Sequence, residues 1–85
     1  MLQEVLDNGA MIVDVRTTNE FSQEHIAGSI NIPLGDIETV IDQLKAKEKP
    51  IVLCCVRRAR SGMATSILSE AGIECYNGGP YTQLM

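Results

Sequence analysis

Two short runs of apolar residues constrain the fold of this chain more than any other feature. Residues 11–15 (MIVDV) and 51–54 (IVLC) are almost continuously apolar, a pattern typical of strands that are covered on both faces. Strands of this kind form parallel sheets that lie between layers of helices. The two runs therefore predict an α/β fold.

Helix-like segments alternate with these strands. Residues 2–6 have helical spacing before the stop signal Asn8-Gly9, and a capping box of Thr17 and Glu20 predicts a helix over residues 18–24. Two longer helices are predicted from their cap residues and apolar faces. The first is capped by Asp36 and turns four apolar side chains inward: Ile37, Val40, Ile41 and Leu44. The second is capped by Ser61, ends at Gly72 and turns five side chains inward: Met63, Ala64, Ile67, Leu68 and Ala71.

Two further short strands complete the pattern. Residues 29–32 end at Pro33, and residues 73–76 precede a sequence at 78–80 (GGP) that predicts a turn and then a short stretch of helix. Strands that alternate with helices imply right-handed crossovers. We therefore expect one domain over residues 1–85, with a small parallel sheet of about four to five strands and helices on both faces.

Composition narrows the class of protein. The chain has 85 residues, 45% of them hydrophobic and 21% charged, which fits a folded domain and argues against a disordered chain. It has no apolar run near the roughly 18 residues of a membrane helix, and no basic and then apolar start typical of a signal peptide. Its three cysteines are odd in number and two are adjacent, which predicts free thiols and a cytoplasmic setting without membrane association.

The charges are unevenly distributed along the chain. The net charge is −4, yet residues 49–68 contain four basic residues, Lys49, Arg57, Arg58 and Arg60, and no acidic one. A chain that is acidic elsewhere is poorly suited to binding nucleic-acid phosphates. One concentrated cationic loop is suited to attracting a small anion, although a solvated basic loop is the plainer alternative.

Topology predicts the position of the functional site before any chemistry is considered. In parallel sheets flanked by helices, ligands bind beyond the carboxyl ends of the strands. Residues 14–16 (DVR) and 55–61 (CVRRARS) both lie at such ends. We therefore expect the site to be built from these two segments.

Cys55 is the candidate nucleophile. It follows an apolar strand and precedes a helix, so the positive end of the helix dipole and the loop amides would face its sulfur and favour the reactive thiolate. The alternative is a small buried side chain, which is the expected role of Cys54 and Cys75 because both lie within apolar strands. The loop residues that would bind the substrate are Val56, Arg57, Arg58, Ala59, Arg60 and Ser61.

Other candidate site residues have supporting roles. His25 is the single histidine, and we expect it to be hydrogen bonded within the fold rather than paired with Cys55 as in a Cys-His hydrolase. The spacing of the cysteines and the histidine matches no common zinc pattern, so no metal is expected. Asp14 and Arg16 are expected to brace the site through an ion pair with Glu20 or another loop group.

Taken together, these segments resemble the rhodanese family. The segments that carry the resemblance are IVDVR at residues 12–16, EF at 20–21, HIAGSINIP at 25–33, IVLCC at 51–55, RS at 60–61 and GG at 78–79. They occur in order over nearly the whole chain. The resemblance implies a sulfurtransferase fold and a persulfide on Cys55, with Arg60 closing the loop and Asp14 and Arg16 as a structural pair.

The same resemblance implies a reaction and its partners. A small anionic sulfur donor such as thiosulfate would load Cys55, and an acceptor such as cyanide, a thiol or a partner protein would remove the sulfur. No cofactor beyond the covalent persulfide is implied, and we expect a monomer. Residues 55–60 form a six-residue loop, whereas the related cell-cycle phosphatases and arsenate reductases use a loop one residue longer.

Two departures from the family pattern keep alternatives open. Arg58 stands where the family often has glycine, and no tryptophan follows the glycine pair at residues 78–79. One alternative is a non-enzymatic module that relays persulfide or binds a partner. The other is an enzyme of the phosphatase or arsenate-reductase type.

Overall fold

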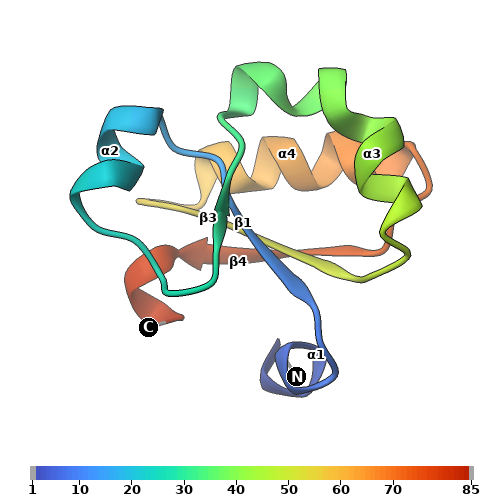
Figure 1. The fold of residues 1–85 in the computed structure, drawn as a ribbon, viewed down its shortest axis with the longest axis horizontal. Helices are drawn as coiled ribbons and strands as arrows, with labels where there is room; N and C mark the ends of the chain where they lie inside the picture. The colour runs from blue at the N-terminus through green and yellow to red at the C-terminus, as the bar shows by residue number, and fades with distance from the viewer. Residues whose placement is uncertain (1, 85) are drawn as a thin grey trace.

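The computed structural model describes residues 2–84 and contains a four-stranded parallel sheet (Figure 1). Its strands are β1 (Met11–Asp14), β2 (Ile30–Asn31), β3 (Ile51–Cys55) and β4 (Cys75–Pro80), in the spatial order β2-β1-β3-β4. All neighbouring strands pair in parallel. The predicted α/β fold and its parallel sheet are confirmed.

Helical segments connect the strands and cover the sheet. They are α1 (Leu2–Asp7), α2 (Thr18–Gln23), the 3₁₀ helix η1 (Leu34–Val40), α3 (Ile41–Ala46), α4 (Ala59–Glu70) and the 3₁₀ helix η2 (Tyr81–Gln83). Figure 1 shows α4 and the η1–α3 segment on one side of the sheet and α1 on the other. Helices thus lie on both faces, as predicted. None of these described helices is long and apolar enough to cross a membrane.

The side chains of β3 point alternately to the two faces of the sheet. Ile51, Leu53 and Cys55 face the core that is shared with α4 and η1. Val52 and Cys54 point to the opposite face and are also fully buried. Burial on both faces explains why residues 51–55 form a continuous apolar run. Because adjacent strand residues point in opposite directions, Cys54 points away from Cys55, as predicted.

Local signals predict the first elements correctly. Thr17 and Glu20 form the capping box at the start of α2: the Thr17 hydroxyl accepts from the Glu20 amide, and the Glu20 carboxylate accepts from the Thr17 amide. Gly9 follows α1 with a φ of 89°. This left-handed conformation is one that glycine adopts without a steric cost, so the predicted helix stop is confirmed.

The helix predicted to be capped by Asp36 begins earlier. η1 starts at Leu34, directly after Pro33, and neither η1 nor α3 has a side-chain cap. The Asp36 amide already donates to the Pro33 carbonyl at 2.8 Å, which closes a 3₁₀ turn before Asp36 could act as a cap. The predicted cap was therefore wrong, although Ile37 and Leu44 are buried as expected.

The predicted start of α4 was also wrong. The helix begins at Ala59, two residues before Ser61, because the Gly62 amide donates to the Arg58 carbonyl at 2.8 Å and extends the helix toward the loop. Ser61 is therefore a fully buried residue of the first turn rather than a cap. Met63, predicted to face the core, is 59% exposed.

The glycine pair belongs to a strand rather than a turn. β4 continues to Pro80, and its pairing with β3 shifts register so that Leu53 pairs with Asn77 and Cys54 with Gly79. Gly78 is the extra residue of this β-bulge. A Cβ at Gly78 would lie 2.8 Å from Val52 Cγ1 and 3.0 Å from the Leu53 carbonyl oxygen. The predicted turn was wrong because this close packing against β3 keeps the chain in the sheet.

Candidate active site

The carboxyl ends of β1 and β3 lie side by side. Asp14, the last residue of β1, pairs with Cys54 of β3, so Cys55 and the start of the following loop stand next to the segment Asp14–Arg16. Val15 also donates its amide to the Cys54 carbonyl at 3.0 Å. The two segments that topology selected therefore meet at one edge of the sheet.

Cys55 is the last residue of β3 and is 1% exposed. Its sulfur contacts the carbonyl oxygen of Arg57 and lies 3.3 Å from Ser61 Oγ. The Ser61 backbone amide donates to the sulfur at 3.4 Å. The loop amides were predicted to face the sulfur. Within residues 2–84, Ser61 is the one loop residue whose N–H donates to Sγ, whereas Arg57 directs its carbonyl oxygen toward the sulfur.

A small cavity opens over Cys55. It has a volume of about 260 Å³ and is lined by Glu20, Cys55, Val56, Arg57, Ala59 and Arg60. The structure therefore brings Cys55 together with four of the six predicted loop residues. Ser61 is buried and contacts the sulfur without lining the cavity, and Arg58 does not line it either.

Arg58 lies outside the cavity, against the end of β4. A Cβ at Gly79 would stand 2.8 Å from Arg58 Nη1, so the guanidinium lies directly over the backbone of the glycine pair. Gly79 itself has a φ of 73°, a conformation that favours glycine. Of the two adjacent arginines of the predicted binding loop, Arg57 lines the cavity and Arg58 does not.

Arg60 forms an ion pair with Glu20 across the cavity. Its Nη1 lies 2.8 Å from Glu20 Oε1, and its Nη2 lies 3.1 Å from Glu20 Oε2. The hydrogen bond from Arg60 and the backbone bond from Thr17 lower the pKa of Glu20 to about 2. The Glu20 carboxylate is therefore ionised at neutral pH. It compensates the charge of Arg60 and links α2 to the start of α4.

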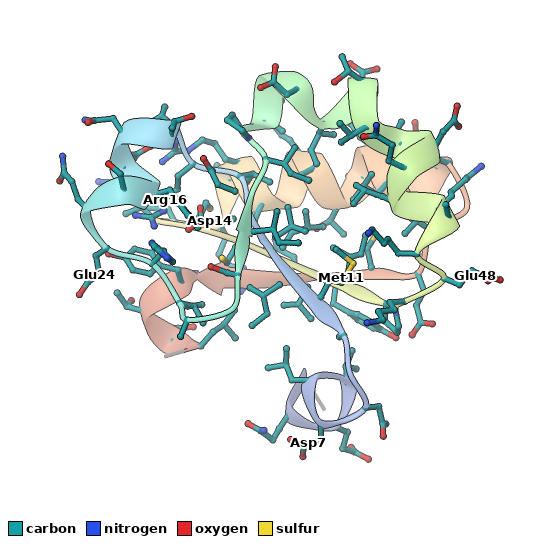
Figure 2. The ribbon with its side chains drawn as sticks, viewed as in Figure 1. Asp7, Met11, Asp14, Arg16, Glu24 and Glu48 are labelled. Carbon is teal, nitrogen blue, oxygen red and sulfur yellow. The ribbon has the colours of Figure 1, made fainter. Side chains whose placement is uncertain are left out.

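Asp14 and Arg16 form a buried pair at the end of β1 (Figure 2). Arg16 Nη2 lies 2.7 Å from Asp14 Oδ2, and the same nitrogen donates to the Glu24 carbonyl at 2.7 Å. The hydrogen bond to Asp14 raises the pKa of Arg16. The partner of Arg16 is therefore Asp14 and not Glu20, and the pair fixes the strand end to the end of α2.

Two residues that sequence reasoning missed complete the surroundings. The Tyr81 ring of η2 covers the Arg16 guanidinium, with 3.9 Å between Cζ and the ring centroid. Asn77 of β4 accepts a hydrogen bond from Ser61 Oγ at 2.6 Å. Tyr81 follows the glycine pair, where the resemblance noted above leads one to expect a tryptophan, and that was the one available signal. Nothing local marks Asn77, because its position depends on the β-bulge.

Comparison with known proteins agrees with this geometry. Residues 1–80 match the Rhodanese-like domain. The chain belongs to the rhodanese-like domain family. Thiosulfate sulfurtransferase PspE of Escherichia coli is 38% identical over 61 residues, which cover 71% of this chain and 59% of PspE. YqhL of Bacillus subtilis is 39% identical over 69 residues, which cover 80% of this chain and 54% of YqhL. This rhodanese-like domain thus spans about half to three-fifths of the length of these two relatives.

Solved structures show the same fold. A rhodanese with anions from E. coli superposes with a TM-score of 0.79 at 32% identity, over 87% of this chain and 89% of that one. The human single-domain sulfurtransferase TSTD1 superposes with a TM-score of 0.73 at 27% identity, over 98% of this chain and 88% of that one. These similarities extend over most of this rhodanese-like domain.

The remaining cysteines of the rhodanese-like domain are structural. All three cysteines are unpaired, but burial raises the pKa of Cys54 to about 12. Burial also raises the pKa of Cys75, whose sulfur donates to the Thr65 carbonyl at 3.3 Å. Both residues therefore stay in the protonated, unreactive form at neutral pH.

His25 also has the structural role that was predicted. Its Nδ1 lies 2.8 Å from the Phe21 carbonyl oxygen, and its ring stacks on Phe21 with 3.8 Å between centroids. No group of three or more metal-ligating side chains occurs among residues 2–84.

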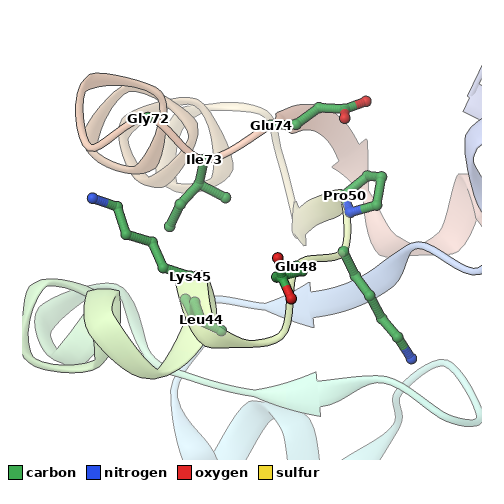
Figure 3. Close-up of a pocket in the computed structure, with 8 residues that line it drawn as sticks. Leu44, Lys45, Glu48, Pro50, Gly72, Ile73 and Glu74 are labelled. Atoms are coloured by element: carbon green, nitrogen blue, oxygen red, sulfur yellow. The ribbon is translucent and has the colours of Figure 1, made fainter.

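Another cavity lies at the opposite end of the sheet (Figure 3). It has a volume of about 280 Å³ and is lined by Leu44, Lys45, Glu48, Lys49, Pro50, Gly72, Ile73 and Glu74. These residues surround the amino ends of β3 and β4, and no cysteine, serine or histidine is among them. Ligands of parallel α/β sheets bind at the carboxyl ends, so the cavity over Cys55 is the stronger candidate.

Proposed function

We propose that this domain is a sulfurtransferase that carries a sulfane sulfur as a persulfide on Cys55. The observation that carries the proposal is the position of the Cys55 sulfur at the end of β3, at the base of a cavity lined by Arg57 and Arg60. Relatives named as sulfurtransferases support it, among them PspE of E. coli and human TSTD1. The persulfide is the covalent intermediate, and we propose no further cofactor.

The first half-reaction loads the sulfur from a small anionic donor such as thiosulfate. The Cys55 thiolate attacks the outer sulfur of thiosulfate and forms a new S–S bond. The S–S bond within thiosulfate breaks, and sulfite leaves with its electron pair. Arg57 attracts the dianion to the cavity, and the Ser61 amide, 3.4 Å from Sγ, stabilises negative charge on the cysteine sulfur.

The second half-reaction removes the sulfur. A nucleophilic acceptor such as cyanide, a thiol or a cysteine of a partner protein attacks the outer sulfur of the persulfide. The new bond forms to the acceptor, and the persulfide bond breaks to return the Cys55 thiolate. Because one product leaves before the second substrate reacts, the enzyme should show ping-pong kinetics.

Turnover of thiosulfate with cyanide tests the proposal. Cys55→Ser should lower thiocyanate formation to the uncatalysed rate, because a serine hydroxyl cannot form a persulfide. Cys75→Ala is the matched control: it removes a buried thiol and should leave turnover near that of the unmodified protein. Release of sulfite by Cys55→Ser, or loss of activity only in Cys75→Ala, would contradict the assignment.

A persulfide relay that lacks turnover with small donors is the second candidate. Val56, which lines the cavity beside Cys55, is 43% exposed and offers an apolar contact to a partner protein. A relay would take sulfur from a persulfidated protein thiol but not from thiosulfate. The phosphatase-type alternative is disfavoured by the six-residue loop at 55–60, which is one residue short of the loop in those enzymes.

We also propose the setting in which the domain works. Its three cysteines are unpaired, and a reactive thiol at Cys55 would be oxidised outside a reducing compartment. We therefore propose that it acts in the cytoplasm, as a monomer, without binding nucleic acid or a membrane. Size-exclusion chromatography with light scattering tests the oligomeric state, and a stable dimer would contradict it.

A further inference from the structure

The Ser61 hydroxyl lies among three hydrogen-bond acceptors but has one proton to donate. Its Oγ lies 2.6 Å from Asn77 Oδ1, 3.3 Å from the Arg58 carbonyl oxygen and 3.3 Å from the Cys55 sulfur. The short bond to Asn77 takes the proton. In this arrangement Ser61 Oγ presents a lone pair to Cys55, and the thiol proton faces two acceptors, the Arg57 carbonyl oxygen and Ser61 Oγ.

The orientation of the Asn77 side chain is fixed by its other neighbours. Oδ1 also accepts from the Gly79 amide at 3.0 Å, and Nδ2 donates to the Arg58 carbonyl at 3.4 Å. A flipped amide would bring its NH₂ group against the Gly79 amide and its oxygen against the Arg58 carbonyl. The β-bulge of β4 therefore keeps the acceptor of Asn77 aimed at the Ser61 hydroxyl.

We propose that Asn77 is a positioning residue that holds the Ser61 hydroxyl proton away from the Cys55 sulfur until that sulfur becomes anionic. The inference rests on the proposed role of Cys55 as the nucleophile. When the thiolate or persulfide anion forms, the Ser61 hydroxyl turns and donates to the sulfur, while Asn77 keeps its bond to Gly79. Each ionisation of the sulfur therefore costs the hydrogen bond between Ser61 and Asn77.

The charges around Cys55 do not compete with this effect. The charged groups nearest the site are Glu20 from α2, Arg57 from the loop, Arg60 from α4, and the Asp14–Arg16 pair at the end of β1, while the Arg58 guanidinium lies outside the cavity over Gly79. A change at Asn77, which is uncharged, removes or adds no charge among these groups. Its effect on reactivity therefore reports on the hydroxyl proton.

The test is the pH profile of Cys55 alkylation by iodoacetamide, followed at this cysteine by peptide mass spectrometry. Asn77→Ala frees the Ser61 proton and should move the profile to lower pH by about half a unit to one unit, the equivalent of one neutral hydrogen bond. Asn77→Leu, which fills nearly the same volume, should shift it in the same direction. Either variant suffices if the other fails to fold.

A double-mutant cycle separates this role from a general loosening of the site. In a Ser61→Ala background there is no hydroxyl proton, so Asn77→Ala should produce no shift. Asn31→Ala is the matched control, because that amide bridges the Asp14 and Arg16 carbonyls at 3.0 Å each and has no contact with Ser61. It should lower stability and leave the alkylation profile unchanged.

Three results would overturn the inference: an unchanged profile in both Asn77 variants, a shift to higher pH, or a shift of equal size with and without Ser61. Thiosulfate loading is measured on the same samples. If the unmodified protein alkylates at Cys55 but takes up no sulfur, the proposed function fails, whereas the role of Asn77 is still decided by the profiles.

Discussion

Arg57 and Arg58 are neighbours in the sequence but have different positions around Cys55. Arg57 lines the cavity over the sulfur, whereas the Arg58 guanidinium lies over the Gly79 backbone. Composition alone gives both residues the same expected role, since both add positive charge to the loop. The direction of each side chain separates them, and it depends on where β4 runs.

Arg57→Ala should therefore weaken thiosulfate binding more than Arg58→Ala does. We expect KM for thiosulfate to rise about three- to tenfold in Arg57→Ala with little change in kcat, because an exposed charge that attracts the donor is lost. Arg58→Ala is the matched control, because it removes the same charge from the loop, and it should change KM less than twofold. Steady-state kinetics at low salt measure both, and equal effects would show that only the loop's net charge matters.

The position of Cys55 could be predicted from sequence, but its partners could not. An apolar strand followed by a helix is a local pattern, and it places Cys55 at a strand end. The Ser61–Asn77 hydrogen bond and the Glu20–Arg60 ion pair join segments that are 16 and 40 residues apart. Such contacts depend on register and packing between elements, and no local pattern encodes them.

At the scale of elements, the Glu20–Arg60 ion pair connects α2 to α4. The folded protein lowers the pKa of Glu20 from 4.5 to about 2, so the unfolded chain takes up a proton at this residue first as the pH falls. The stability from this pair is therefore fully present above about pH 4.5 and is lost as the pH falls toward about 2.

Glu20→Gln should remove that part of the pH dependence. At pH 6 the variant should unfold with a free energy about 0.5–1 kcal/mol below that of the unmodified protein, because the pair is partly exposed and screened by solvent. The difference should shrink as the pH approaches 2. Urea unfolding at several pH values measures it, and a difference that grows on acidification would contradict the ion-pair account.

The two sides of α4 offer a second test at this scale. Leu68 is fully buried, whereas Met63 is 59% exposed on the same helix. Leu68→Ala should cost about 2–5 kcal/mol, since it removes a core side chain and leaves a cavity. Met63→Ala should cost less than about 0.5 kcal/mol. Comparable losses in urea unfolding would place Met63 in the core, as helical periodicity alone predicts.

The errors in predicting elements have one physical origin. Asp36 and Ser61 are good cap residues, yet backbone hydrogen bonds accepted by the Pro33 and Arg58 carbonyls begin the helical turns before them. The glycine pair has the composition of a turn, yet packing against Val52 keeps it in β4. In each case a tertiary or backbone contact outweighed a local preference, and the apolar periodicity that set the fold class was unaffected.

At the scale of the whole molecule, the order β2-β1-β3-β4 brings the candidate site residues to one end of the sheet. The end of β1 supplies the Asp14–Arg16 brace, the end of β3 supplies Cys55, and the end of β4 supplies Asn77 and the glycine pair. The helices complete the site with Glu20 and Arg60. The fold thereby brings groups from β1, α2, α4 and β4 close to the sulfur at the end of β3, although few of them are close in sequence.

The most direct test of the account is the intact mass of the protein after treatment with thiosulfate. We predict a species heavier by one sulfur atom in the unmodified protein and in Cys75→Ala, its absence in Cys55→Ser, and its disappearance when cyanide is added. Uptake of sulfur by Cys55→Ser, or no uptake by the unmodified protein from thiosulfate or from a persulfidated thiol, would contradict the claim that Cys55 carries the sulfur.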